Sequence, residues 1–154
     1  MQLDAFDVRI LAALQRRADM TQDELAEATH LSRSQCSRRV QRLRETGYID
    51  RVVALLDPGR LGLTFKTYVM VTLKSHADTH TEAFGALVAN SEEVLECSML
   101  TGDADYLLLV YTTDLKAFDG FLQTLLHSPA IATVRSSIAL RDIKRTTELP
   151  LPRL

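Results

Sequence analysis

Apolar positions in the first fifty residues recur every three or four residues, which is the spacing of amphipathic helices. The first such segment places four apolar side chains on one helical face: Phe6, Ile10, Leu11 and Leu14. Asp4 and Asp7 lie where the first turn of that helix accepts negative charge. We therefore predict an amphipathic helix of about three turns at the start of the chain.

Two capping boxes predict where the next two helices begin. Thr21 is followed three residues later by Glu24, and Ser32 is followed at the same spacing by Gln35. In each pair the two side chains cap free backbone N–H groups reciprocally. Only residues 29–31 remain between these helices, and two capped helices joined by so short a turn indicate a helix-turn-helix.

The third helix has one apolar side and one polar, basic side. Cys36, Val40 and Leu43 form the apolar stripe, and Gly47 ends the helix. Ser, Gln and Arg side chains on such a helix suit the base edges and phosphates of a DNA major groove. The residues that point most nearly away from the stripe are Ser34, Arg38, Gln41 and Glu45.

Arginine dominates the charge of this region. Residues 32–51 hold six arginines against Glu45 and Asp50, a net charge of +4, within a chain whose net charge is −2. An isolated charge run is more often a solvated face. Here the basic side chains are all arginine, they gather on one helix, and that helix follows a capped partner after a tight turn. These three features favour DNA binding.

Four arginines are better placed for DNA phosphates than for bases. Arg39, Arg42 and Arg44 lie further round the third helix. We predict a short β-hairpin from residues 48–50 and 52–56, with Arg51 at its tip. The expected first domain is therefore a winged helix-turn-helix.

Alternating apolar positions dominate the second half of the chain. Strands are predicted at residues 66–73, 94–101, 106–112 and 132–140, and helices at residues 79–90 and 115–126. The order βαββαβ is that of a ferredoxin-like α+β domain, with both helices on one face of an antiparallel sheet. Apolar residues on both faces of these strands leave an open sheet face that self-association would cover.

The change of periodicity sets the predicted domain boundaries. Helical spacing ends near Asp57, Pro58 and Gly59, which form a turn composition. The prediction is a helix-turn-helix domain at residues 1–56, a linker at 57–65 and a ferredoxin-like domain at 66–154.

Composition and charge narrow the function classes. Of the 154 residues, 46% are hydrophobic and 25% charged, which excludes wholesale disorder. No apolar run approaches the roughly 18 residues that cross a bilayer, and the N-terminus lacks a secretory leader pattern, so a cytoplasmic protein is expected. Cys36 and Cys97 are too few for a disulfide framework or a zinc site, and both are predicted to be reduced core residues.

The acidic turn at residues 102–105 admits two interpretations. Asp and Gly are common in hairpin turns, which favours a structural role by about two to one over a ligand contact. Two aspartates without further ligands do not complete a metal coordination shell. The histidines are scattered, without a catalytic partner at motif spacing: His30, His76, His80 and His127. We therefore expect no cofactor, no metal and no catalytic residue.

Five sequence blocks resemble the Lrp/AsnC family, the leucine-responsive and asparagine regulators also termed feast/famine regulators. They are D-x-R-I-L-x-x-L-Q at 7–15, LSRSQCSRRVQRLRETGYI at 31–49, ALLDP at 54–58, TGDADYLL at 101–108 and SSIALRDIKRTTELPL at 136–151. The blocks occur in the family's order and cover almost the whole chain. The GDADY turn is the most specific of them.

The resemblance implies a transcription regulator that dimerises through the sheets of its second domain and assembles into octamers or similar rings. It also implies a small effector, usually an amino acid, bound between dimers. The ending IKRTTELPL is similar to members that sense neutral amino acids, often apolar or sulfur-containing. The partners expected from it are double-stranded DNA, further copies of the chain and a free amino acid.

Carried over residue by residue, the resemblance assigns most of the DNA contacts to the third helix. Together with the residues argued above, the predicted DNA contacts are Ser32, Arg33, Ser34, Gln35, Ser37, Arg38, Arg39, Arg42 and Arg51. The predicted effector contacts are Thr101, Gly102, Asp103, Asp105 and Ser136. Turn amides suit the carboxylate of a free amino acid, and an aspartate suits its ammonium group.

Two other functions are kept as alternatives. Some relatives of this architecture act in tetrapyrrole metabolism as sirohaem decarboxylases, which need His or Arg side chains around a large porphyrin cleft. The sequence shows no such cluster and keeps an arginine-rich third helix that an enzyme would not require. The second alternative is an effector-independent architectural protein that coats DNA. The favoured expectation is an effector-gated DNA-binding regulator that is not an enzyme.

Overall fold

The computed structural model describes residues 2–153. Their contacts divide the chain into two compact units. One unit holds the residues up to Leu55 together with those from Lys144 onward, and the other runs from Leu56 to Ile143. Each unit has its own buried apolar core.

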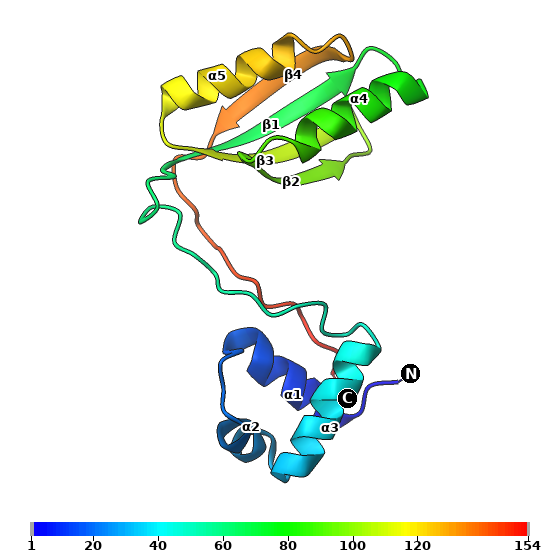
Figure 1. Cartoon of the computed structure of the whole chain (residues 1–154), viewed down its shortest axis with the longest axis vertical. Coiled ribbons are helices and arrows are strands. Elements are labelled where there is room, and N and C mark those ends of the chain that lie inside the picture. The colour runs from blue at the N-terminus through cyan, green and yellow to red at the C-terminus, as the bar shows by residue number, and fades with distance from the viewer. Residues whose placement is uncertain (1, 154) are drawn as a thin grey trace. The chain divides into compact units, whose positions relative to one another are not determined.

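Three helices build the first unit (Figure 1): α1 (Ala5–Arg16), α2 (Gln22–Thr29) and α3 (Arg33–Glu45). The two predicted capping boxes are confirmed, and a third one precedes α1. In that third box Asp4 accepts from the Asp7 N–H, and the Asp7 carboxylate accepts from the Asp4 N–H. Each helix therefore begins where the sequence supplies a side chain for its free N–H groups.

The core of the first unit joins one side of each helix. Its fully or nearly buried members are Ile10, Leu25, Cys36, Val40 and Leu43. The apolar stripe predicted on the third helix is confirmed, because its three residues all lie in this core. Two backbone turns close the unit: His30 caps α2 in the left-handed region at φ 55°, and Gly47 follows α3 at φ 78°.

The hairpin predicted after α3 is wrong for the single chain. Residues 46–64 are all described, and no strand is assigned among them. Four apolar side chains of the expected second strand are more than half exposed: Val52, Val53, Leu55 and Leu56. An isolated two-stranded hairpin is only marginally stable, and Arg51 is not a residue that favours a tight hairpin turn.

The second unit has the predicted βαββαβ order. Its elements are β1 (Phe65–Leu73), α4 (Asp78–Ala89), β2 (Val94–Met99), β3 (Tyr106–Thr112), α5 (Leu115–Leu126) and β4 (Ile131–Ile138). The strands pair antiparallel in the order β2-β3-β1-β4. Figure 1 shows α4 and α5 on the same face of this sheet, so the ferredoxin-like prediction is confirmed.

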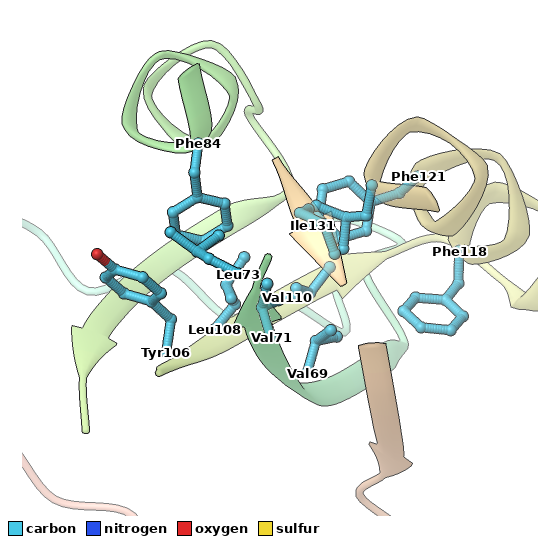
Figure 2. Packing of buried hydrophobic residues seen from close by; sticks show 11 residues of the cluster. Val69, Val71, Leu73, Phe84, Tyr106, Leu108, Val110, Phe118, Phe121 and Ile131 are labelled. Atoms are coloured by element: carbon cyan, nitrogen blue, oxygen red, sulfur yellow. The ribbon is translucent and has the colours of Figure 1, made fainter. Parts of the chain in front are cut away.

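The core of the second unit lies between the sheet and its two helices. Alternate residues of β1 and β3 point toward the helices because side chains alternate across a strand. Figure 2 shows Phe84 of α4 and Phe121 of α5 directed at the sheet residues Val71, Leu108 and Val110. Phe84 also packs against Tyr106, with ring centroids 4.5 Å apart and ring planes tilted by 38°.

The opposite face of the sheet is open in the single chain. Tyr68 and Met70 of β1 lie on it, and each is 37% exposed. The neighbouring β3 residues Leu107 and Leu109 are partly buried. The predicted open sheet face is therefore confirmed for the single chain: the strands are apolar on both faces, and the helices cover only one of them.

Cys97 departs from its predicted place in the core. Cys36 is fully buried in the first unit, but Cys97 lies exposed on β2. β2 is an edge strand that pairs only with β3, and five of its six residues are exposed. Apolar neighbours in sequence do not bury a side chain on an edge strand whose residues are mostly exposed.

The end of the chain contacts the first helix. The sequence pattern predicts that these residues belong to the second domain, whereas the structure groups those from Lys144 onward with the first unit. Gln15 Nε2 donates to the Leu149 carbonyl at 3.2 Å, and Arg16 Nε donates to Glu148 Oε2 at 2.9 Å. These contacts join residues more than 130 positions apart, so local sequence patterns do not reveal them.

Candidate functional site

The exposed face of α3 carries the side chains that the sequence placed opposite the buried stripe. Ser34, Ser37, Arg38 and Gln41 are all exposed. Among the described residues, the Arg38 side chain takes part in no ion pair or side-chain hydrogen bond. Arg38 therefore presents a free guanidinium from the middle of this face.

The N-terminal end of α3 is held in place by its own polar side chains. Gln35 Oε1 accepts from the Ser32 N–H at 3.0 Å and from the Ser32 hydroxyl at 2.9 Å. The hydroxyls of Ser32 and Ser34 lie 3.2 Å apart. Three of the predicted contact residues are thus ordered together at the helix start.

Two of the predicted DNA-contacting arginines bind carboxylates of their own unit. Arg39 Nη1 donates to Asp4 Oδ2 and to Asp7 Oδ1, each at 2.7 Å. Arg42 Nη2 donates to both carboxylate oxygens of Asp7, also at 2.7 Å. Asp7 is 1% exposed, so a buried carboxylate on α1 ties down two arginines of α3.

The charges in this cluster stabilise one another. The Asp4 carboxylate, followed by that of Asp7, holds the pKa of Arg39 above its ordinary value, although partial burial acts the other way. Partial burial would raise the pKa of Asp4, but hydrogen bonds from the Asp7 N–H and from Arg39 lower it overall. Both groups are therefore charged at neutral pH. The Arg39 guanidinium also lies 5.3 Å from the Phe6 ring centroid.

The remaining arginines of the basic region are exposed. Arg33 forms an ion pair with Asp23 of α2. Arg51 Nε lies 3.7 Å from Asp50 Oδ2, and both of these side chains are more than three-quarters exposed. Arg44 near the end of α3 is exposed and has no side-chain partner among the described residues.

The turn between β2 and β3 is fixed by backbone hydrogen bonds. Leu100 N–H donates to the Asp105 carbonyl at 2.8 Å, and Asp105 N–H donates to the Val71 carbonyl at 3.0 Å. Gly102 has φ 137°, a conformation that side-chain-bearing residues rarely adopt. The turn therefore has one defined shape and is attached to β1.

The two aspartates of this turn lie in different environments. Asp105 Oδ2 accepts from the Leu73 N–H at 2.7 Å, and Asp105 Oδ1 lies 3.4 Å from His76 Nε2. Asp103 is exposed, and its carboxylate has no side-chain partner among the described residues. The carboxylate of Asp105 thus binds the end of β1, while that of Asp103 faces solvent.

Ser136 lies apart from the turn within the single chain. It is exposed on β4 and pairs in register with Val69, whereas the turn contacts Val71 and Leu73. β1 lies between β3 and β4, so one strand separates the turn from Ser136. Thr101 and Gly102 are exposed beside Asp103.

Three residues that shape these sites do not stand out in the sequence. The pattern indicates Asp4 and Asp7 only as favourable charges at a helix start, and His76 only as a scattered histidine. The available signal for Asp7 was the pair Arg39 and Arg42, which lie three residues apart and hence on one side of α3. No local pattern indicates that His76 faces Asp105.

Residues 2–153 contain no group of three His, Cys, Asp or Glu side chains placed to hold a metal ion. Within the same residues no helix is long and apolar enough to cross a membrane.

The first unit is a capped helix-turn-helix with a basic exposed face, and it is joined to a ferredoxin-like unit. This combination defines a two-domain DNA-binding regulator. Two family models match the chain in that order. Winged helix-turn-helix DNA-binding matches residues 3–50, and the Lrp/AsnC ligand binding domain matches residues 66–149. The chain therefore belongs to the Lrp/AsnC family and is a DNA-binding transcription regulator.

Individual relatives match over nearly their whole lengths. The DNA-binding transcriptional activator DecR of Escherichia coli K12 is 36% identical over 150 residues, covering 97% of this chain and 99% of DecR. The leucine-responsive regulatory protein of Salmonella typhimurium is 34% identical over 148 residues, covering 96% of this chain and 90% of that protein.

Solved structures agree with the fold of the whole chain. A transcriptional regulator of Neisseria meningitidis in complex with L-Met is 39% identical, with a TM-score of 0.94 and 97% of each chain covered. An AsnC family transcriptional regulator of Agrobacterium tumefaciens is 36% identical, with a TM-score of 0.91, covering 96% of this chain and 97% of that one.

Proposed function

We propose that α3 reads operator DNA through Arg38 and the polar side chains at its N-terminal end. The observation that carries this proposal is the unpaired, exposed guanidinium of Arg38 opposite the buried stripe. Arginine binds the two acceptors of guanine in the major groove with both arms of its guanidinium. Ser34 and Ser37 flank Arg38 on the exposed face and suit bases or phosphates.

The other arginines divide into two groups. Arg33, Arg44 and Arg51 are exposed and are proposed to contact DNA phosphates. Arg39 and Arg42 are bound by the buried Asp7, so their proposed main role is to fix α3 against α1. Arg42 is still 42% exposed and is proposed to touch a phosphate as well, but Arg39 is only 20% exposed.

We further propose that the effector is a free amino acid, bound with its ammonium group on Asp103. Asp103 offers an unpaired, exposed carboxylate. Thr101 and Gly102 supply neighbouring turn groups for the effector's carboxylate, and Asp105 positions the turn by binding the Leu73 N–H. Because the similar Neisseria regulator holds L-Met, L-methionine is the first candidate.

A thermal-shift screen of the twenty amino acids tests the effector proposal. A ligand that binds only the native state raises the melting temperature. L-Methionine or another neutral amino acid is expected to raise the melting temperature of the wild type and to have no effect on Asp103→Ala. Asp78→Ala, which removes an exposed carboxylate at the start of α4, is the matched control and should respond like the wild type. A wild type that responds to none of the twenty amino acids contradicts this proposal.

We propose that a second copy covers the open sheet face, and that dimers assemble further into octamers or similar rings. Ser136 and the turn are separated within one chain, which is consistent with an effector site completed by neighbouring copies. Met70 lies in the open face, so Met70→Asp is expected to shift the mass measured by light scattering to that of a smaller species. An unchanged mass for Met70→Asp contradicts dimerisation through this face.

We propose a purely regulatory function in the cytoplasm, without an enzymatic reaction and without a cofactor. The names of the relatives support it, since they are transcription regulators. A purified protein that carries a coloured tetrapyrrole would favour a sirohaem decarboxylase-like enzyme. A flat thermal-shift screen with retained DNA binding would favour an effector-independent protein that coats DNA.

A further inference from the structure

Glu148 and Leu149, near the C-terminus, are hydrogen-bonded to the last turn of α1 and belong to the first unit. The side chain of Gln15 and the backbone of Leu149 bond reciprocally, because Gln15 Nε2 donates to the Leu149 carbonyl and Leu149 N–H donates to Gln15 Oε1 at 3.0 Å. Arg16 adds the ion pair to Glu148 at 2.9 Å. Glu148 N–H donates to Thr146 Oγ1 at 3.0 Å, which orders the segment locally.

The segment that leads to this contact is anchored at its other end on the second unit. Lys66 Nζ donates to Asp142 Oδ1 at 2.6 Å, and Ala139 N–H donates to the Lys66 carbonyl at 2.9 Å. Lys66 Nζ also lies 5.4 Å and 5.8 Å from the ring centroids of Tyr68 and Tyr111. The Asp142 carboxylate holds the pKa of Lys66 above its ordinary value, so this anchor is charged at neutral pH.

Only residues 143–147 lie between the two anchors. They contain no helix or strand and are exposed throughout. The other connection between the units is longer. Ile49 still packs on the first core, and the next anchor is Thr64, whose Oγ1 donates to the carbonyl of Thr113 just after β3. Residues 50–63 lie between these two points.

We propose that residues 142–149 form a C-terminal strap, a short second tether from the Lys66–Asp142 anchor to Gln15 and Arg16 of α1, which limits the motion of the DNA-binding unit. A chain segment restricts the two points it joins more strongly when it is shorter. The strap is therefore the shorter connection from the sheet to α1, and hydrogen bonds and an ion pair complete it at the α1 end. The restraint itself does not depend on the regulatory function proposed above. Only its use, to pass an effector signal from the second unit to the DNA-binding unit, rests on that function.

The contacts that hold the strap on α1 are few and partly exposed. The Arg16 and Glu148 side chains are 70% and 44% exposed, and exposed ion pairs contribute little stability. Local contacts of this kind open without global unfolding. The strap is thus able to release α1 and rebind it while both cores stay folded.

Hydrogen exchange of the Leu149 amide tests whether the strap is docked in solution. In the full-length wild type this amide is expected to exchange more slowly than a free amide, because it donates to Gln15 Oε1. Gln15→Ala is expected to speed its exchange by about five-fold or more, while the amides of α1 keep their protection. Arg17→Ala is the matched control, since Arg17 pairs with Asp19 and Glu24 and not with the strap. A Leu149 amide that exchanges freely in the wild type overturns the proposal.

Pulsed electron spin resonance tests whether the docked strap restrains the units. Spin labels are placed at Glu27→Cys on α2 and Glu82→Cys on α4 in a Cys97→Ser background, and labelled chains are diluted with unlabelled protein. Arg16→Glu is expected to widen the distance distribution about two-fold, and Arg16→Glu combined with Glu148→Arg to restore it. Arg17→Glu should leave the width unchanged. If Arg16→Glu speeds exchange of the Leu149 amide but leaves the distance distribution as narrow as in the wild type, the strap does not restrain the units. This measurement needs neither DNA nor effector, so its failure is distinct from failure of the regulatory function.

Discussion

At the scale of single residues, Asp7 stands out because it is a buried carboxylate that binds two arginines of another helix. It accepts from the Asp4 N–H, from Arg39 and twice from Arg42. Such a cluster does not necessarily add stability compared with an apolar core, but removing an arginine would leave the buried Asp7 carboxylate with fewer partners. The cluster therefore makes the orientation of α3 dependent on one side chain of α1.

Replacement of Asp7 by Ala is expected to destabilise the first unit by about 1–3 kcal/mol, because Arg39 and Arg42 lose their hydrogen bonds to Asp7 but stay partly exposed, and Arg39 keeps its ion pair with Asp4. Chemical denaturation followed by circular dichroism measures this loss. Asp19→Ala is the matched control, since Asp19 pairs with Arg17 at 3.7 Å on the surface, and its loss should stay below about 1 kcal/mol. Equal losses for the two variants would contradict a special role for Asp7.

The capping box of α2 predicts a stability that depends on acidic pH. Hydrogen bonds from the Thr21 N–H, then from Arg17, hold the pKa of Glu24 below its ordinary value of 4.5. A carboxylate with a lowered pKa in the native state contributes stability above pH 4.5, and this contribution is lost as the pH falls below 4.5 toward the native pKa. Melting temperatures measured from pH 7 to about pH 3 should fall less steeply for Glu24→Gln, which keeps the cap geometry without the charge. Parallel curves for the two proteins would contradict this source of the acid sensitivity.

At the scale of elements, the turn between β2 and β3 depends on one glycine. Gly102 has φ 137°, so Gly102→Ala is expected to strain the turn and destabilise the second unit by about 1–3 kcal/mol. Gly120 lies inside α5 with no atom within 4 Å of an added Cβ. Gly120→Ala should therefore stabilise the same unit by about 0.5–1 kcal/mol. Thermal unfolding of the two variants checks the opposite signs, and a loss of stability in both would contradict the assignment of strain to the turn.

The helices and strands were predictable because local sequence determines them. Thr21, Ser32 and Gly47 mark helix ends through contacts within a few residues, and the structure has those ends where they were predicted. Whether a residue is buried depends on which element covers it. Cys97 shows this, since it lies among apolar residues but on an edge strand, and its partial desolvation still raises the pKa of its thiol.

The sequence predicts which residues form the candidate sites. It does not predict which partner each side chain binds. The exposed face of α3 follows from helical spacing alone, whereas the pairing of Arg39 and Arg42 with Asp7 depends on how α3 packs on α1. The turn at residues 101–105 was located from its composition. That Asp105 binds the Leu73 N–H, and Asp103 faces solvent, depends on the pairing of β1 with β3. The predicted hairpin is not formed: residues 46–64 hold no strand, and a two-stranded hairpin without a third strand is only marginally stable.

At the scale of the whole molecule, the small net charge conceals two opposite contributions. Residues 1–60 carry a net charge of +1 and residues 61–154 one of −3, while the basic region at 32–51 reaches +4. A patch of six arginines, two of them bound by Asp7, gives each copy only a few phosphate contacts. Presentation of several copies at once multiplies such weak contacts. DNA binding is therefore expected to depend on both assembly and salt.

The affinity of Arg38→Ala and Arg44→Ala for two DNAs across a salt series decides whether α3 reads the operator through Arg38. One DNA is an operator selected from random sequence by the wild type, and the other is its scrambled counterpart. Arg38→Ala is expected to lose about 1–3 kcal/mol on the operator and almost nothing on scrambled DNA. Arg44→Ala should weaken both DNAs equally and lower the salt slope by about one per copy bound. If Arg38→Ala keeps the wild-type preference for the operator, α3 does not read DNA in the way proposed.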